Sequence, residues 1–288
     1  MTVQVRAGHR APLFAMLRGI TKVPLYVILL AGAVVSAFPI YWMIVAGTRS
    51  TADIYSSPPV LLPGGFLGTN WRSLFEGTTF LGNLGVSLLL ATAYTILAGL
   101  VSAMAGFALA KYQFRGRQAL VTVMLMMMTI PYQVTLVPLF EMMSAFGWLD
   151  TFQGALLPTL LNAFGVFFMR QTFLQFPNEL IEAAQIDGAS DSRIFFGIAL
   201  PAVRPAAAVL ALVLFMAQWN SFLWPLLVLV SPEKFTAPVY LASLIGLTAT
   251  DYGVLMLGTA VATLPSLLIF LLFQRQFVSG IVAGAVKA

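Results

Sequence analysis

Residues 77–110 read GTTFLGNLGVSLLLATAYTILAGLVSAMAGFALA, a stretch without a single Asp, Glu, Lys or Arg. A helix needs about 20 mostly apolar residues to cross the hydrocarbon core of a bilayer. This stretch is longer than that, and we expect the spanning part to begin near Gly82. Small residues recur along it at helical spacing, at Gly99, Ser102, Ala103, Gly106 and Ala110. Small side chains let a neighbouring helix approach closely, so we expect tight helix packing here.

The same charge-free pattern recurs along the chain. Stretches of at least 19 residues without Asp, Glu, Lys or Arg cover residues 23–48, 77–110, 118–140, 151–169, 205–232 and 252–274. They predict an all-α fold, a polytopic transmembrane helix bundle with six spans. The first stretch is longer than the apolar core of a cleaved signal peptide, so we expect it to remain as a span. Residues 54–71 are also uncharged, but their prolines and glycines predict an outer loop.

Composition excludes several classes of protein. Of the 288 residues, 60% are hydrophobic and only 9% charged, and the mean hydropathy is +0.93. A soluble domain carries roughly a quarter charged residues, so a soluble enzyme, a disordered tail and a nucleic-acid-binding domain are excluded. The chain has no cysteine and one histidine, His9. We therefore expect no disulfide and no zinc or other metal site.

The fifteen Lys and Arg residues indicate the orientation of the predicted spans. Twelve fall in segments on one side and three, Arg49, Arg72 and Lys234, in segments on the other. Because Lys and Arg accumulate in cytoplasmic loops, this bias predicts that both termini are cytoplasmic, in agreement with an even number of spans. The chain then divides into a cytoplasmic tail (1–22), a transmembrane domain (23–277) with a cytoplasmic loop at about 175–202, and a second cytoplasmic tail (278–288).

The longest charged segment on the predicted cytoplasmic side reads FPNELIEAAQIDGAS over residues 176–190. Gly188 suits a helix end that needs a left-handed residue. Ser190 can cap a second helix that extends through Ile198 and ends before Pro201. The pattern predicts two short helices joined at a glycine. From the residues alone, an amphipathic loop that lies on the membrane surface explains the segment equally well.

The same segment resembles the signature of ABC importer permeases, E-A-A-x3-G-x9-I-x-L-P. The matching residues are Glu182, Ala183, Ala184, Gly188, Ile198, Leu200 and Pro201. Further stretches resemble the carbohydrate-uptake branch of that family, which includes the smaller maltose permease subunit and the glycerol-3-phosphate permease. They are AKYQFRGR (110–117), IPYQVTLVPL (130–139), QWNSFLWPL (218–226) and FVSGIVAGAVK (277–287).

The resemblance implies a type I importer-like permease in the cell membrane that forms half of a translocation pathway for a sugar. It implies that the loop couples transport to a separate ATPase through Glu182, Ala183, Ala184, Asp187, Gly188, Ile198, Leu200 and Pro201. The implied partners are a second homologous permease subunit, two ATP-binding-cassette ATPase subunits and an extracytoplasmic solute-binding protein. ATP and Mg belong to the ATPase subunits, with no cofactor in this chain.

Alternative functions are narrowed but not all removed. No lysine follows a glycine, so the G-x-x-x-x-G-K-[ST] phosphate-binding loop is absent, and we expect a transport subunit rather than an enzyme. A permease for a glycerol phosphate or related polar solute remains an alternative. An uncoupled channel or secondary transporter is an alternative from another class. Ion-driven transporters usually place ionisable residues inside the membrane, whereas the six stretches contain no Asp, Glu, Lys, Arg or His.

Polar and aromatic side chains within the charge-free stretches are candidates for the substrate pathway. Sugars are bound by hydrogen-bonding groups combined with aromatic faces. The candidates are Gln218, Trp219, Asn220, Trp224, Tyr132 and Asn162. The alternative is that Gln218 and Asn220 bond neighbouring helices. Pro131 and Pro138 predict a kink in the third stretch, and kinks often accompany a pathway.

The predicted topology can be tested with single cysteines, because the chain has none of its own. Cysteines placed at Ser57 and Ser192 should react with a membrane-impermeant maleimide from opposite sides of the membrane. Labelling of both positions from the outside would refute the six-span arrangement.

Overall fold

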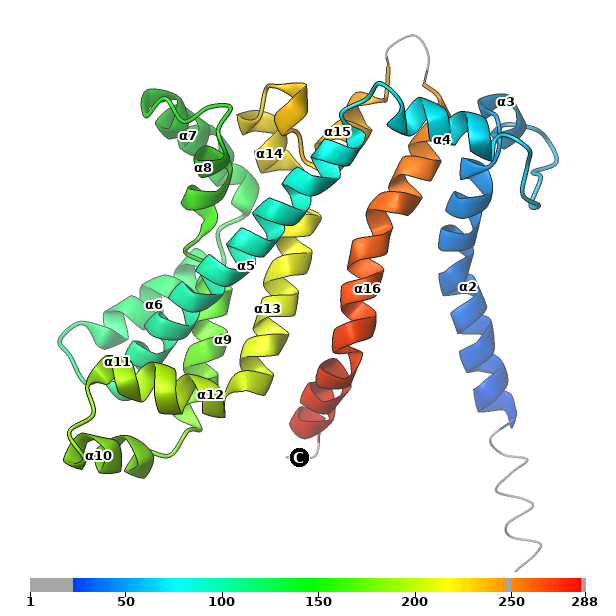
Figure 1. The fold of residues 1–288 in the computed structure, drawn as a ribbon. Helices are drawn as coiled ribbons and strands as arrows, with labels where there is room; N and C mark the ends of the chain where they lie inside the picture. Colours follow the sequence, from blue (N-terminus) through cyan, green and yellow to red (C-terminus); the bar gives the residue numbers. More distant parts are fainter. Residues whose placement is uncertain (1–22, 247–249, 286–288) are drawn as a thin grey trace, which may run out of the picture.

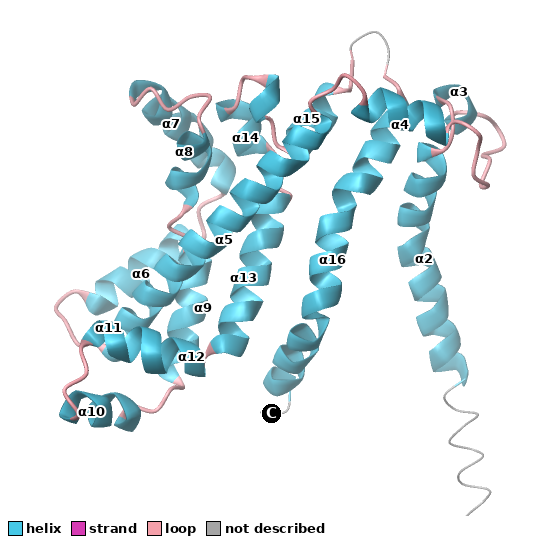
Figure 2. Ribbon diagram, in the orientation of Figure 1, coloured by secondary structure: helices cyan, strands magenta, loops and turns pink. Residues whose placement is uncertain are grey.

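The computed structural model describes the backbone of residues 23–246 and 250–285 and the side chains of residues 24–246 and 250–273. The predicted tail 1–22 lies outside the described residues, as do residues 286–288 of the predicted second tail. The described part of the chain is entirely helical and contains no strand (Figure 2). The all-α prediction is therefore confirmed.

In the described part of the chain, three long helices and three bent helix pairs form the bundle, and short helices connect them (Figure 1). In chain order the elements are α2 (Val23–Gly47), α3 (Thr51–Ile54), α4 (Leu67–Phe75), α5 (Phe80–Lys111), α6 (Arg117–Met127), α7 (Tyr132–Ala145), α8 (Phe152–Leu156), η1 (Leu157–Thr159), α9 (Ala163–Leu174), α10 (Glu179–Ile186), α11 (Asp191–Ile194), η2 (Phe195–Ala199), α12 (Leu200–Ala202), α13 (Arg204–Trp219), α14 (Leu223–Val228), η3 (Pro232–Lys234), α15 (Ala237–Ser243) and α16 (Tyr252–Ala285). Helix α4 begins inside the stretch 54–71 that the sequence assigns to a loop, so only the first part of that stretch lacks helix.

Three of the helices are long and apolar enough to cross a membrane without interruption: Pro24–Gly47, Phe80–Lys111 and Tyr252–Phe273. Three further helix pairs pass the same test together but are bent at a short break, which gives up to six spans by length and composition. The pairs are Arg117–Met127 with Tyr132–Ala145, Phe152–Thr159 with Ala163–Leu174, and Asp191–Ala202 with Arg204–Trp219, bent by 103°, 45° and 84°. The number of spans and the orientation of the termini stay predictions.

Pro131 lies at the sharpest of these bends. It is the cap residue before α7, and its missing N–H and fixed backbone angle suit a helix start rather than a helix interior. Pro138 lies within α7. The predicted kink in the third stretch is confirmed at Pro131, and it separates the stretch into two helices.

Helix α5 packs against its neighbours at its small residues. A Cβ added to Gly106 would lie only 2.7 Å from Met169 Cβ on α9, and one added to Gly165 would lie 2.5 Å from Ser102 Oγ. The backbones of α5 and α9 therefore approach too closely for larger side chains. The other side of α5 faces α13, where Leu214 lies 3.8 Å from the Cβ position of Gly99. The expected role of the small residues in helix packing is confirmed.

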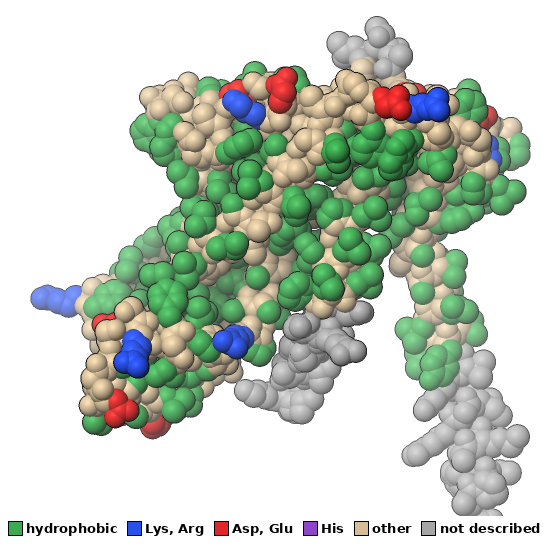
Figure 3. Space-filling model, in the orientation of Figure 1, with side chains coloured by type: hydrophobic (Ala, Val, Ile, Leu, Met, Phe, Trp, Pro, Cys, Tyr) green, Lys and Arg blue, Asp and Glu red, His purple; other side chains and the backbone are tan. Residues whose placement is uncertain are grey.

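The two ends of the bundle are polar and its middle is apolar. Figure 3 shows charged side chains at the two ends of the face in view and hydrophobic side chains between them. The start of α2, the end of α16 and the segment α10–α12 lie at one end, whereas α3, α4 and α15 lie at the other (Figure 1). The apolar middle suits contact with lipid hydrocarbon.

Asp150 joins two loops by hydrogen bonds at the end of the bundle opposite α10. Its Oδ1 accepts hydrogen bonds from the backbone N–H groups of Val230 and Ser231, both at 2.9 Å. Its Oδ2 accepts from Lys234 Nζ at 2.8 Å and from Ser231 Oγ at 2.6 Å. The bonds from Lys234 and Ser231 hold the pKa of the Asp150 carboxyl well below its usual value. The loop before α8 is thereby joined to the segment after α14.

The hydrogen bonds that Asp150 accepts predict a pH-dependent contribution to the stability of the folded protein. Because folding lowers the pKa of Asp150, its contribution is present above the ordinary Asp pKa of about 3.9 and is lost as the pH falls below it. The variant Asp150→Asn keeps one acceptor oxygen but loses the charge, so it should lower the apparent Tm of the purified protein by a few degrees at neutral pH. Its difference from wild type should shrink as the pH falls below about 4.

The matched control is Glu233→Gln, which makes the same change of charge at an exposed neighbouring residue. Its Tm should equal that of the wild type at both pH values. Equal Tm values for Asp150→Asn and wild type at neutral pH would contradict a stabilising role for the hydrogen bonds of Asp150.

Candidate functional site

The segment 175–202, the candidate coupling loop, contains the first predicted helix as α10. The acidic residues Glu179 and Glu182 lie in its first turn, where they face the positive end of the helix dipole. At its other end Gly188 has φ +76°, as predicted for a left-handed helix end. The N–H of Gly188 donates to Gln185 O at 3.0 Å and that of Ala189 to Ala184 O at 2.9 Å. This pair of bonds closes the helix as a Schellman motif and turns the chain sharply.

Helix α10 has one face on the bundle and one face in the open. Ile181 and Ala184 are buried against the main hydrophobic core. Glu182, Ala183 and Asp187 are exposed, so three of the predicted coupling residues lie on the free face.

Ile186 was not among the sequence candidates, although its side chain is 86% exposed at the end of α10. Ile186 is therefore part of the exposed end of α10, together with Glu182 and Asp187. The signal in the sequence was an apolar residue that follows the buried positions 181 and 184 at the wrong spacing to share their face.

The second part of the loop rests on the bundle, and its helix is longer than predicted. Ser190 Oγ accepts from the Arg193 N–H, and Ile194 and Phe195 are buried. The helix continues as α11, η2 and α12 through Pro201 to Ala202, so the expectation that it ends before Pro201 is wrong.

The η2 segment is a π-helical turn, and this explains the longer helix. The Leu200 N–H donates to Phe195 O, five residues back. Pro201, which has no N–H, follows in a turn that is already widened, so the missing donor does not end the helix. Ile198, Leu200 and Pro201, the remaining predicted coupling residues, are half-buried along this segment.

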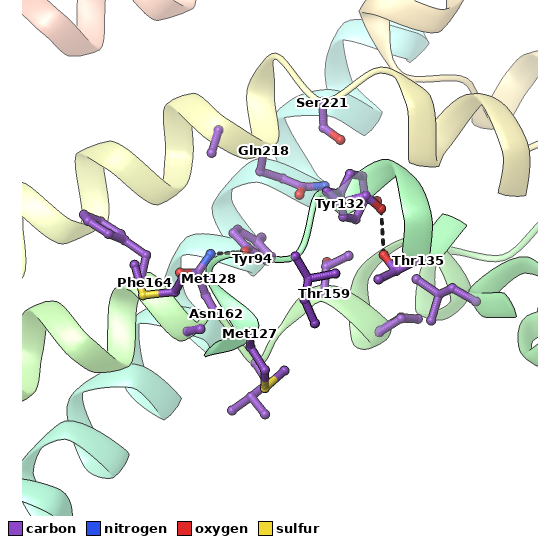
Figure 4. Close-up of a pocket in the computed structure, with 16 residues that line it drawn as sticks. Tyr94, Met127, Met128, Tyr132, Thr135, Thr159, Asn162, Phe164, Gln218 and Ser221 are labelled. Carbon is purple, nitrogen blue, oxygen red and sulfur yellow. Dashed lines mark hydrogen bonds between the residues drawn. The ribbon is translucent and has the colours of Figure 1, made fainter. Parts of the chain in front are cut away.

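A pocket with a volume of about 680 Å³ lies between α5, α7, α9 and α13 (Figure 4). This volume is in the range of small-molecule sites. Seven of the 16 lining residues have neutral polar side chains, namely Tyr94, Tyr132, Thr135, Thr159, Asn162, Gln218 and Ser221. Apolar residues such as Met127, Met128 and Phe164 complete it. None of the lining residues is charged.

Two helix breaks produce the pocket. The first lies between α6 and α7 at Pro131, and the second lies between η1 and α9. At the second break Asn162 caps α9, since its Oδ1 accepts from the Gly165 N–H at 2.8 Å. Asn162 Nδ2 donates to Tyr94 Oη at 3.1 Å, which links α9 to α5 (Figure 4). The polar groups that the breaks expose are thus partly satisfied by side chains.

The six pathway candidates separate into two groups. Tyr132, Asn162 and Gln218 line the pocket. The other three do not line it, and each has a partner elsewhere. Trp219 is buried and its Nε1 donates to Ala262 O on α16 at 3.2 Å. The Asn220 amide donates to Met216 O on its own helix at 2.8 Å, and Trp224 Nε1 donates to Gly154 O at 3.2 Å.

Sequence reasoning missed four polar lining residues, Tyr94, Thr135, Thr159 and Ser221. Tyr94 stands within the apolar stretch 77–110, so a polar aromatic side chain at membrane depth was the available signal. Threonine and serine give little signal, because their hydroxyls often bond the backbone of their own helix. Thr135 Oγ1 does so with Tyr132 O at 2.7 Å.

Metal coordination has no candidate residues in the described part of the chain. No three His, Cys, Asp or Glu side chains come together there as a metal site would require. The pocket lining offers hydroxyls, amides, aromatic rings and thioethers, which suit hydrogen bonding and ring contacts with an uncharged ligand.

The sequence matches one family model, described as the inner membrane component of binding-protein-dependent transport systems, over residues 95–282. The arabinooligosaccharides transport system permease protein of Halalkalibacterium halodurans is 34% identical over 88% of this chain and 92% of its own. The lactose transport system permease protein of Rhizobium radiobacter is 36% identical over 91% and 95%. The sn-glycerol-3-phosphate transport system permease protein of Pectobacterium atrosepticum is 33% identical over 89% and 94%.

The fold has a solved counterpart. It is a chain in the crystal structure of a bacterial ABC transporter involved in the import of the acidic polysaccharide alginate. The TM-score is 0.76 over 94% of this chain and 99% of that chain, with 21% sequence identity. At this identity the likeness concerns the fold.

Proposed function

The chain belongs to the family of binding-protein-dependent transport system inner membrane components, and from that premise we propose that it is a permease subunit of an ABC importer for an uncharged carbohydrate. The observation that carries the proposal is the exposed helix α10, which holds Glu182 and Ala183 on its free face and ends at the left-handed Gly188. The sequence around it has the E-A-A-x3-G-x9-I-x-L-P spacing of the family.

The proposal assigns ATP hydrolysis to other chains. The sequence has no G-x-x-x-x-G-K-[ST] loop, so energy must come from partner ATPase subunits that hold ATP and Mg. We infer a complex with two such subunits, a second permease and an extracytoplasmic binding protein. In this arrangement α10 faces the cytoplasm, together with the start of α2 and the end of α16, which lie at the same end of the bundle (Figure 1).

The pocket lining favours a sugar over a glycerol phosphate. Relatives of both kinds are about equally similar to this chain, at 33–36% identity, so similarity does not choose between them. An anion loses its hydration on entering a pocket and needs a countercharge, whereas none of the lining residues is charged. Hydroxyl and amide groups can instead exchange hydrogen bonds with sugar hydroxyls, and Tyr94, Tyr132 and Phe164 offer aromatic faces.

The coupling loop is tested by three variants in the complete transporter. Glu182→Lys reverses an exposed charge, Ile186→Asp replaces an exposed apolar side chain, and Gly188→Val forces a β-branched residue into a left-handed conformation. Each should lower copurification of the ATPase and reduce uptake by about ten-fold or more, the effect of losing a contact worth about 1.4 kcal/mol. Membrane insertion should not change, because no predicted span is altered.

The control is Glu233→Lys, the same charge reversal at an exposed residue near the other end of the bundle. It should copurify with the ATPase as the wild type does. Wild-type uptake and copurification in all three loop variants would show that the loop is only a membrane-surface segment. Ligand-dependent ATP hydrolysis by the isolated, contaminant-free chain would contradict the assignment of ATP to partner subunits.

Gln218→Leu tests the pocket. The change keeps the approximate volume but removes both hydrogen-bonding groups of the amide, so uptake at low substrate concentration should fall about ten-fold, as expected for one or two lost hydrogen bonds. Complex assembly and basal ATP hydrolysis should persist. Uptake is measured with proteoliposomes and radiolabelled neutral oligosaccharide.

Two further variants serve as comparisons for Gln218→Leu. Gln153→Leu makes the same change at an exposed residue outside the pocket lining and should leave uptake unchanged. Asn220→Leu tests the candidate whose amide bonds Met216 O, and lost uptake with normal Tm would place it on the pathway. Wild-type uptake in Gln218→Leu would remove that residue from the substrate site.

A further inference from the structure

The segments just before and just after α10 are both hydrogen-bonded to the end of α5. Before α10, Lys111 Nζ donates to Phe176 O at 2.5 Å and to Asn178 Oδ1 at 2.7 Å. After α10, Tyr112 Oη donates to Asp191 Oδ1 at 2.9 Å. Lys111 is the last residue of α5 and Tyr112 is its cap. Two adjacent residues therefore hold both the entry and the exit of the exposed helix.

A cluster of aromatic rings packs next to these hydrogen bonds. Phe107, one turn before Lys111 on α5, lies 5.7 Å from the ring of Tyr112, measured between centroids. It also lies 5.2 Å from Phe173 at the end of α9 and 5.4 Å from Phe195 in η2. Burial, followed by the hydrogen bond to Asp191 and its charge, raises the pKa of Tyr112 to about 12. The hydroxyl is therefore a hydrogen-bond donor throughout the physiological range.

Helix α5 connects these anchors to the pocket without a break. Tyr94 precedes Lys111 by 17 residues on the same helix, which corresponds to about 25 Å along its axis. At the pocket Tyr94 bonds Asn162, the cap of α9, and α9 in turn ends at Leu174, just before Phe176. Helices α5 and α9 are thus joined by polar side chains at the pocket and again at the coupling loop.

We propose that Lys111 and Tyr112 are positioning residues that pass the displacement of the coupling loop to α5 and so to the pocket. The inference rests on the proposed function, because it assumes that an ATPase moves α10. The connections on both sides of α10, residues 175–178 and 187–190, are short non-helical segments. Ile181 and Ala184 of α10 already pack in the core that contains Phe107 of α5, and the two anchors add hydrogen bonds on both sides of that contact. The anchors make the loop and α5 move as one body.

The test is the ratio of substrate transported to ATP hydrolysed in proteoliposomes that contain the complete transporter. Tyr112→Phe removes one oxygen, and Lys111→Met removes the donor but keeps a chain of similar length. Each should lower the ratio by roughly ten-fold, as expected for a lost hydrogen bond to a strong partner. ATPase copurification and basal hydrolysis should stay at the wild-type level, which separates these variants from Glu182→Lys and Ile186→Asp.

Variants of Asp191, the hydrogen-bond partner of Tyr112, test the positioning role further. Asp191→Asn keeps an acceptor oxygen for Tyr112 and should retain most of the ratio, whereas Asp191→Leu should lower it as Tyr112→Phe does. The double variant Tyr112→Phe with Asp191→Leu should be no worse than either single one, because both remove the same bond. Tyr26→Phe, a hydroxyl deletion at an exposed residue of α2, is the matched control and should match wild type.

The outcomes distinguish this inference from the function on which it rests. A wild-type ratio in both Tyr112→Phe and Lys111→Met would overturn the positioning role while leaving the importer assignment intact. Loss of ATPase copurification in parallel with transport would also overturn it, because the residues would then only maintain the shape of the loop. If the wild-type complex shows no ligand-stimulated ATP hydrolysis, the proposed function itself fails.

Discussion

A backbone that passes through hydrocarbon must satisfy its own hydrogen bonds, and the rest of this structure depends on that constraint. Uninterrupted helices meet it in α2, α5 and α16. Where a helix is broken, the exposed polar groups need other partners. The breaks before α7 and α9 both border the pocket, and Asn162 supplies side-chain bonds at one of them. The pocket lies where two of the helices are interrupted, and its lining combines residues at these breaks with Tyr94 and Gln218 from within α5 and α13.

Helix α5 organises the contacts between the two functional regions. Small residues let it approach α9, and Tyr94 brings it to the pocket. At one end Asn83 Nδ2 donates to the carbonyls of Pro232 and Phe235, and at the other end Lys111 and Tyr112 hold the coupling loop. A single uninterrupted helix with polar contacts at its ends and its middle is a direct physical connection between the candidate coupling loop and the pocket.

The pocket lining is uncharged, whereas the candidate coupling loop carries several charged side chains. No charged side chain lines the pocket, and Figure 3 shows charged side chains at the two ends of the face in view. The solved counterpart belongs to an importer of an acidic polysaccharide, yet it shares the fold at 21% identity. The likeness therefore concerns the fold, and a fold does not by itself specify a ligand.

The sequence alone determined the features that depend on local chemistry. Charge is excluded from hydrocarbon whatever the fold, so the apolar stretches predicted the helices. Proline and glycine act on their own backbone, so the break at Pro131 and the left-handed Gly188 were also predictable. Only the tertiary structure decided which side chains face the pocket. Gln218 and Trp219 are adjacent in sequence but point about 100° apart around α13, so one lines the pocket and the other reaches α16. The two anchors from α5 likewise depend on how distant helices are rotated against one another, which no local pattern records.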